Sequence, residues 1–157
     1  MEWGRSSAHR PKHDDACRVG LADTRKTSSM IDHVSLGVRD LALSQRFYDA
    51  ALRPLGLVRI VDFEGRGSDD GSAPGSLGVE FTIPEESGVV SSRGMHICFL
   101  ARDRDAVATF HNAALANGGR DDGAPGLRPQ YHSSYVLDPD GHRVEAVCHA
   151  PEYPERL

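Results

Sequence analysis

Two histidines and two glutamates in this chain have side chains that can hold a metal ion. His33 and His96 each lie near the start of a short alternating run, and Glu80 and Glu145 each end a Val-Glu pair further along. Neutral imidazole together with carboxylate oxygen suits a divalent first-row ion such as Zn²⁺, Ni²⁺, Mn²⁺ or Fe²⁺. A single strand histidine is more often structural than ligating, so the hypothesis depends on whether these positions are related.

An internal repeat relates them. Shifting the chain by 63 residues places residues 33–57 over residues 96–120 without a gap, with eight identical pairs. Those pairs are His33 with His96, Arg39 with Arg102, Asp40 with Asp103, Phe47 with Phe110, Ala50 with Ala113, Ala51 with Ala114, Leu52 with Leu115, and Gly56 with Gly119. The two Val-Glu pairs are 65 residues apart, so the second copy has gained two residues between histidine and glutamate. Two copies of one supersecondary unit are expected.

Each copy predicts a strand, a helix and further strands. Alternating residues 31–38 and 95–101 predict strands half buried against helices. Asp40 and Asp103 then serve as N-caps for segments with apolar residues at helical spacing. Both helices are expected to end at glycines, which are Gly56 in the first copy and Gly118–Gly119 in the second.

The remaining residues complete the predicted fold. Residues 57–63 and 77–83 predict strands with a loop at 64–76, while 134–137 and 142–148 predict a hairpin around the turn at 138–141. We therefore expect an α+β fold of two tandem βαβββ modules whose strands form a curved sheet around a shared groove. The expected limits are module one at 30–86 and module two at 93–150, within one domain at 30–150, with a polar extension at 1–29 and a tail at 151–157.

Strand alternation gives the histidines a common direction. Apolar residues belong under the helix of each module, which is the side expected for Val34, Leu36 and Val38 in the first copy and for Met95, Ile97 and Phe99 in the second. His33 and His96 then face the groove, the latter beside Cys98 and Leu100. If the two glutamates also face inward, two imidazoles and two carboxylates meet there.

Composition excludes some partners. The net charge is -5 without a run of Lys and Arg, which argues against nucleic acid. No apolar stretch approaches the length of a membrane span. The three cysteines are far apart and form no zinc-knuckle spacing, which favours a reducing, cytoplasmic setting.

Three segments resemble the vicinal oxygen chelate superfamily, which includes glyoxalase I, extradiol dioxygenases and bleomycin-resistance proteins. They are MIDHVSLGVRDLALSQRFYDAALRPLGL at 30–57, GMHICFLARDRDAVATFHNAALANGG at 94–119 and LDPDGHRVEAVCH at 137–149. The resemblance implies that His33, His96 and Glu145 are metal ligands, with Glu80 as the fourth ligand in glyoxalase-like members. It also implies a divalent metal cofactor and a small-molecule substrate.

The resemblance leaves three functions open. In a glyoxalase-like lyase or isomerase, Glu80 or Glu145 would move a proton between neighbouring carbons of a substrate that chelates the metal through adjacent oxygens. In an extradiol-type dioxygenase, His33, His96 and Glu145 would hold Fe²⁺ and leave positions for a catechol and O₂. A metal-free, drug-binding protein of the bleomycin-resistance type is the third. Glu80 discriminates between the first two, because a fourth ligand closes a position that oxygen chemistry needs.

Other polar residues receive secondary roles. Tyr131, His132 and Tyr135 lie in a segment expected near the groove and are predicted to bind substrate. His111 follows Phe110 on the second helix and is predicted to lie on its surface. A homodimer is possible, because the groove can form within one chain or between two.

Overall fold

The computed structural model describes residues 31, 33–63, 66–71, 80–92 and 94–149. The predicted extension at 1–29 and tail at 151–157 lie outside these residues. Module one contains β1 (His33–Ser35), α1 (Leu41–Leu52), the 3-10 helix η1 (Arg53–Leu55), β2 (Val58–Asp62), β3 (Gly67–Gly71) and β4 (Glu80–Pro84). Module two contains β5 (His96–Leu100), α2 (Arg104–Ala116), β6 (Arg120–Leu127), β7 (His132–Leu137) and β8 (Arg143–Cys148).

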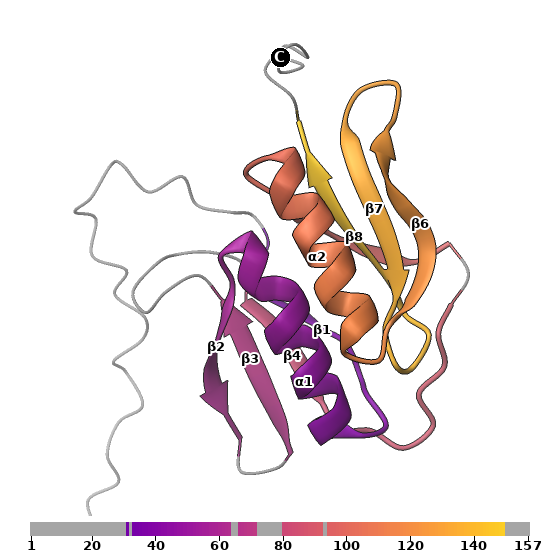
Figure 1. The fold of residues 1–157 in the computed structure, drawn as a ribbon. Coiled ribbons are helices and arrows are strands. Elements are labelled where there is room, and N and C mark those ends of the chain that lie inside the picture. The colour runs from indigo at the N-terminus through magenta and orange to yellow at the C-terminus, as the bar shows by residue number, and fades with distance from the viewer. Residues whose placement is uncertain (1–30, 32, 64–65, 72–79, 93, 150–157) are drawn as a thin grey trace, which may run out of the picture.

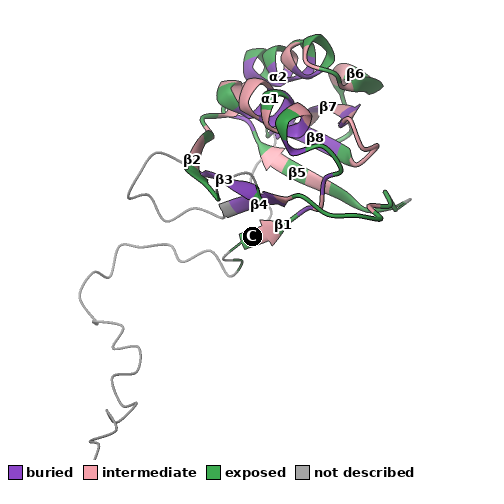
Figure 2. Cartoon of the chain, turned by 90° about the horizontal axis from the view of Figure 1, so that it is seen from below, coloured by how far each residue is buried: buried purple, intermediate pink, exposed green. Residues whose placement is uncertain are grey.

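The two modules have the same topology. Their sheets have the orders β1-β4-β3-β2 and β5-β8-β7-β6, and in each the first strand pairs in parallel with the last while the other pairs are antiparallel. The helices α1 and α2 lie side by side, each against the sheet of its own module (Figure 1). Viewed from below, both helices form one layer and the strands the other, with buried residues between them (Figure 2). The predicted α+β fold of two βαβββ modules is confirmed.

Both helices begin at the predicted aspartates. The Asp40 side chain accepts a hydrogen bond from the backbone N–H of Leu43 at 2.9 Å, and that of Asp103 accepts one from Ala106 at 2.7 Å. Each bond satisfies an N–H group that the first helical turn leaves without a partner. The predicted caps are therefore confirmed, and they set the residues at which α1 and α2 begin after β1 and β5.

A chain of aromatic rings joins the two modules into one core. Phe47 and Tyr48 on α1 have ring centroids 4.9 Å apart, Tyr48 and Phe81 on β4 are 5.0 Å apart, and Phe81 and Phe99 on β5 are 5.5 Å apart. Phe110 on α2 is fully buried in the same cluster. Because rings from both modules pack together, neither sheet is stabilised independently of the other.

The β7–β8 turn is bound to module one by polar contacts. The buried Tyr48 hydroxyl donates to Asp138 Oδ2 at 2.8 Å, and Arg39 Nε donates to Asp140 Oδ1 at 2.6 Å. His142 Nε2 donates to the carbonyl oxygen of Gly37 at 3.0 Å. These contacts hold the turn that begins β8, the strand that carries Glu145.

Replacing Tyr48 with Phe should destabilise the protein more at neutral than at acidic pH. The change leaves Asp138 Oδ2 buried without its donor, which costs about 1–3 kcal/mol. Burial raises the pKa of Asp138, so the stability due to its protonated form is complete at low pH and is lost as the pH rises through that raised pKa. The Tyr48 hydroxyl, which donates to the ionised carboxylate, therefore contributes most to stability above the raised pKa of Asp138. Urea unfolding at about pH 4 and pH 7 measures the difference.

The matched control is Tyr131→Phe, which removes a hydroxyl from a half-buried tyrosine. Equal losses of stability in both variants at both pH values would show that the buried bond between Tyr48 and Asp138 does not stabilise the contact between the modules.

Three features differ from the sequence predictions. The segment expected as a loop at 64–76 contains β3, because its backbone pairs with β2 on one side and β4 on the other despite a turn-like composition. The chain also forms β6, which the sequence did not indicate. His111 is buried, not on the helix surface, and its Nε2 donates to Asp121 Oδ1 of β6 at 3.0 Å. Among the described residues, no helix is long and apolar enough to cross a membrane.

Candidate metal and substrate site

Strand alternation places the histidines as predicted. In β1, His33 and Ser35 are exposed, while Leu36 and Val38 just beyond the strand are buried in the core. In β5, His96, Cys98 and Leu100 are exposed, whereas Ile97 and Phe99 pack against the core. Met95 is half exposed and not under α2. Each module thus presents a histidine on the sheet face away from its helix, the inner face.

His96 and Glu145 form a pair on the inner face of module two. His96 Nε2 lies 3.2 Å from Glu145 Oε2, and 5% of the Glu145 side chain is exposed. The other carboxylate oxygen, Oε1, is buried and has no hydrogen-bond partner in the described part of the chain. A buried carboxylate oxygen without a donor costs free energy that a bound cation or proton would recover. The donor pair therefore fits a divalent ion, with Glu145 anchored in the sheet and His96 partly open to solvent.

Two neighbours of Glu145 are held in their protonated forms. Burial and the Glu145 carboxylate raise the pKa of the Cys98 thiol to about 12. Burial is the main cause that raises the pKa of the Tyr135 hydroxyl, and hydrogen bonding with Glu145 raises it further. Both groups lie beside Glu145, since it pairs with Cys98 across β5–β8 and with Tyr135 across β7–β8. The thiol and the phenol therefore face Glu145 as neutral groups.

In module one, His33 and Glu80 stand directly opposite each other. Their Cα atoms are partners in the parallel pair of β1 and β4. In module two the corresponding partner of His96 is Arg143, and Glu145 lies two residues further along β8. This two-residue step is the one that the sequence repeat contains. Because side chains alternate with a period of two, the two-residue step keeps Glu145 on the same strand face as Arg143.

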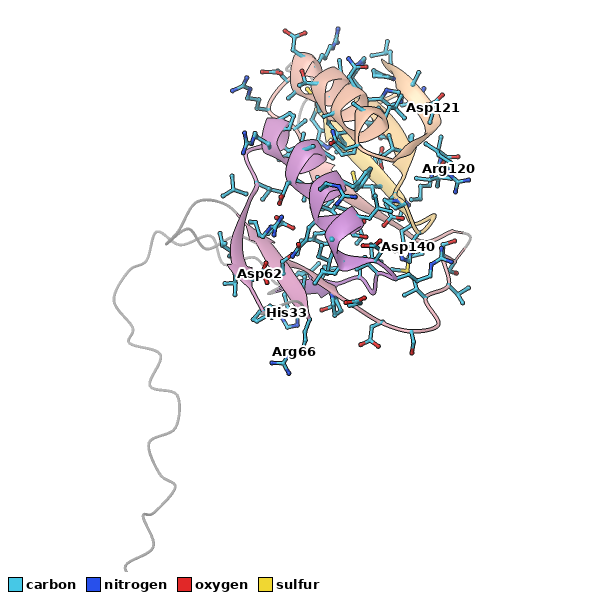
Figure 3. The ribbon with its side chains drawn as sticks, turned by 60° about the horizontal axis from the view of Figure 1, so that its bottom comes forward. His33, Asp62, Arg66, Arg120, Asp121 and Asp140 are labelled. Carbon is cyan, nitrogen blue, oxygen red and sulfur yellow. The ribbon has the colours of Figure 1, made fainter. Side chains whose placement is uncertain are left out.

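The two histidines do not belong to one three-donor cluster in the described part of the chain. Among the residues that the structure describes, no three His, Cys, Asp or Glu side chains come close enough to hold a metal ion together. His33 lies in the module-one part of the molecule, away from Arg120 and Asp121 at the outer edge of module two (Figure 3). Within the described residues, the donor pair of module two therefore does not include His33 of module one.

The predicted substrate residues fall on two faces. Tyr135 lies on the inner face opposite Glu145, and its ring is 6.2 Å from that of His96. Tyr131 lies just before β7, an even number of residues from Tyr135, so strand alternation places it on the same face. His132 pairs with Cys148, a core residue, and so lies on the helix side. Burial lowers the pKa of His132, and the charges of Arg104 and Arg128 lower it further.

Sequence reasoning missed two arginines at this site. Arg143 and Arg128 have Cζ atoms 4.2 Å and 5.8 Å from the centre of the Tyr135 ring. Arg143 could have been found from its place two residues before Glu145, which puts both on one strand face. Arg128 gave no local signal, because it reaches Tyr135 by folding back over β6.

The fold and the paired donors define a class of protein built from two βαβββ modules, with polar side chains on the inner sheet face. The model of the Glyoxalase/Bleomycin resistance protein/Dioxygenase superfamily matches residues 30–146. The chain therefore belongs to this superfamily, as the sequence resemblance implied.

Solved structures share the fold. A glyoxalase/bleomycin resistance protein from Albidiferax ferrireducens T118 is 30% identical with a TM-score of 0.69, covering 78% of this chain and all (100%) of that one. The fosfomycin resistance protein FosX from Listeria monocytogenes is 21% identical with a TM-score of 0.61, covering 81% and 98%. Lactoylglutathione lyase from Agrobacterium tumefaciens is 20% identical with a TM-score of 0.54, covering 78% and 96%. No curated protein matches the chain.

Proposed function

We propose that the protein is a metal-dependent, glyoxalase-like lyase or isomerase. The observation that carries the proposal is the buried Oε1 of Glu145, which has no hydrogen-bond partner in the described chain and belongs to a carboxylate whose other oxygen lies 3.2 Å from His96. His33, His96, Glu145 and Glu80 would hold a divalent ion, namely Zn²⁺, Ni²⁺, Mn²⁺ or Fe²⁺. Membership of the superfamily supports this donor set.

The residues divide the chemistry between them. The ion would supply a Lewis acid for two adjacent oxygens of a small substrate. Glu145, or Glu80 from module one, would take a proton from one carbon of the substrate and return it to the neighbouring carbon. Tyr135 and Tyr131 would line the substrate side of the inner face, and the Tyr135 hydroxyl would keep the Glu145 carboxylate oriented.

We further propose that two copies of the chain complete the site. Module one of one chain would place His33 and Glu80 opposite His96 and Glu145 of the other. Two observations support a shared site, namely the absence of a three-donor cluster among the described residues and a large apolar side chain exposed on the inner face of module two. Leu100 lies on the inner face of β5 and is 69% exposed, so it is a large apolar group that a second copy would cover.

Metal content tests the proposal. Protein purified without chelator should retain a divalent ion, and Glu145→Gln or His96→Ala should lower metal affinity by more than the roughly 10- to 100-fold that loss of an outer-shell partner causes. His111→Asn is the matched control, since it alters a buried histidine on the helix side. If the native protein neither retains nor takes up any divalent ion, both metal-dependent functions are wrong and a metal-free binding protein is favoured.

Glu80→Gln separates the two metal-dependent functions. We expect it to weaken metal binding, as loss of a fourth ligand would in a lyase. Unchanged metal affinity together with oxygen consumption in the presence of catechols would contradict the lyase and favour the dioxygenase.

A further inference from the structure

Two positively charged side chains lie against one tyrosine beside the proposed metal ligands. The guanidinium carbons of Arg143 and Arg128 are 4.2 Å and 5.8 Å from the centre of the Tyr135 ring, and that ring is 6.2 Å from the ring of His96. Tyr135 also pairs with Glu145 across β7–β8. Any ligand held by His96 and Glu145 is therefore within reach of both cations if it extends by only a few atoms.

Arg128 is positioned by glycines of β6. A Cβ atom added to Gly123 would lie 3.2 Å from Tyr135 Cδ2 and 3.6 Å from Arg128 Nη2, and one added to Gly126 would lie 3.4 Å from Arg128 Nη1. The Arg128 guanidinium group thus lies over the backbone of Gly123 and Gly126, in space that the side chain of a larger residue would fill. Arg128 makes no ion pair with any residue that the structure describes, so the interaction with the ring leaves its charge uncompensated.

Arg143 is held from one side. Its Nε donates to Asp122 Oδ2 at 2.6 Å, while 43% of its side chain stays exposed. On β8 it pairs with His96, the register position that Glu80 has opposite His33 in module one. Module two therefore carries a cation where module one carries a carboxylate. A cavity of about 270 Å³ lies on the other side of Arg143 and His96, where Gly37 and Met95 also line it, so both side chains border open space.

We propose that Arg128 and Arg143 form an anion-binding subsite and that the substrate carries a carboxylate in addition to its metal-chelating oxygens. A carboxylate presents two coplanar oxygens that match the forked N–H groups of guanidinium. The charge of Arg128 has no acidic partner among the described residues, and Arg143 keeps exposed N–H surface beyond its bond to Asp122. The inference rests on the proposed function, because the metal site fixes the other end of the same substrate.

Malate and lactate make a matched pair of probes. Both carry a 2-hydroxy acid that can chelate a metal ion, and malate adds one carboxylate where lactate has a methyl hydrogen. Isothermal titration of the Zn²⁺- or Mn²⁺-loaded protein should show malate binding about tenfold more tightly than lactate. Arg128→Ala should reduce the ratio to about one, and Arg128→Lys should restore part of it. Arg53→Ala, at an exposed arginine beside α1, should leave the ratio unchanged.

The outcomes separate the two proposals. If metal is bound and the malate preference survives Arg128→Ala, the subsite is wrong while the metal-dependent function stands. If no metal binds, the proposed function is wrong, and malonate binding to the metal-free protein then decides the subsite. Malonate affinity lowered by Arg128→Ala but not by Arg53→Ala would support it, and equal affinities would overturn it. Thermal unfolding of each variant shows whether a lost preference reflects lost folding.

Discussion

Mixing two inactive variants should restore metal binding and activity that neither has alone. The first variant carries His33→Ala and Glu80→Ala, and the second carries His96→Ala and Glu145→Gln. If the site is shared between two chains, each homodimer has only damaged sites, because every site takes one half from each module. A heterodimer, however, joins the intact module one of the second variant to the intact module two of the first.

The size of the recovery is set by symmetry. Random exchange of equal amounts makes about half of the dimers heterodimers, each with one intact site of two, so binding capacity should return to about a quarter of the native value. Metal titration after unfolding and refolding the mixed chains measures it. Recovery indistinguishable from that of either variant alone would indicate that the groove closes within one chain. Sedimentation velocity on the same samples shows whether dimers are present at all.

Replacing Gly119 with Ala should cause the largest loss of stability among the single substitutions considered. A Cβ atom at this position would lie 2.6 Å from Phe47 Cε2 and 2.8 Å from the carbonyl oxygen of Ala114. Phe47 is fully buried, and the carbonyl belongs to the last turn of α2, so neither can move freely. Overpacking of this kind costs typically 1–3 kcal/mol, and we expect about 3 kcal/mol in urea unfolding.

The control and a double mutant identify the cause. Gly37→Ala brings its Cβ no closer than 3.4 Å to the exposed Glu86 side chain and should change the free energy of unfolding by less than about 0.5 kcal/mol. Phe47→Leu replaces the ring with a smaller side chain. It should lower the free energy of unfolding less in the Gly119→Ala background than in the native chain, with a coupling of about 1 kcal/mol. Additive losses would show that the clash with Phe47 is not the reason.

Local patterns in the sequence predicted the framework of the site. The 63-residue repeat predicted two modules of one topology, Asp40 and Asp103 predicted both helix starts, and strand alternation predicted the exposed face of His33 and His96. Each of these features depends on residues within one or two turns or strands. Their physical causes, hydrogen bonds from a cap and burial at a fixed period, can therefore be read from the chain directly.

Tertiary packing decided what surrounds those histidines. The bond of Tyr48 to Asp138 joins residues 90 apart, and that of His142 to Gly37 joins residues 105 apart. His111 is buried on α2 with Asp121 of β6 as its hydrogen-bond partner, and Arg128 reaches Tyr135 because glycines leave the face of β6 open. Such contacts depend on which strands become neighbours, and no local period encodes that choice.

The same division applies to the proposed metal site. The sequence by itself determined the donor types and the two-residue step between the Val-Glu pairs. The tertiary structure placed Glu145 against His96 and left the other oxygen of that carboxylate, Oε1, buried without a hydrogen-bond partner in the described chain. It also kept His33 out of that pair within the described residues. The reason is that residue types and face are set along one strand, whereas the distance between two modules is set by how their cores pack.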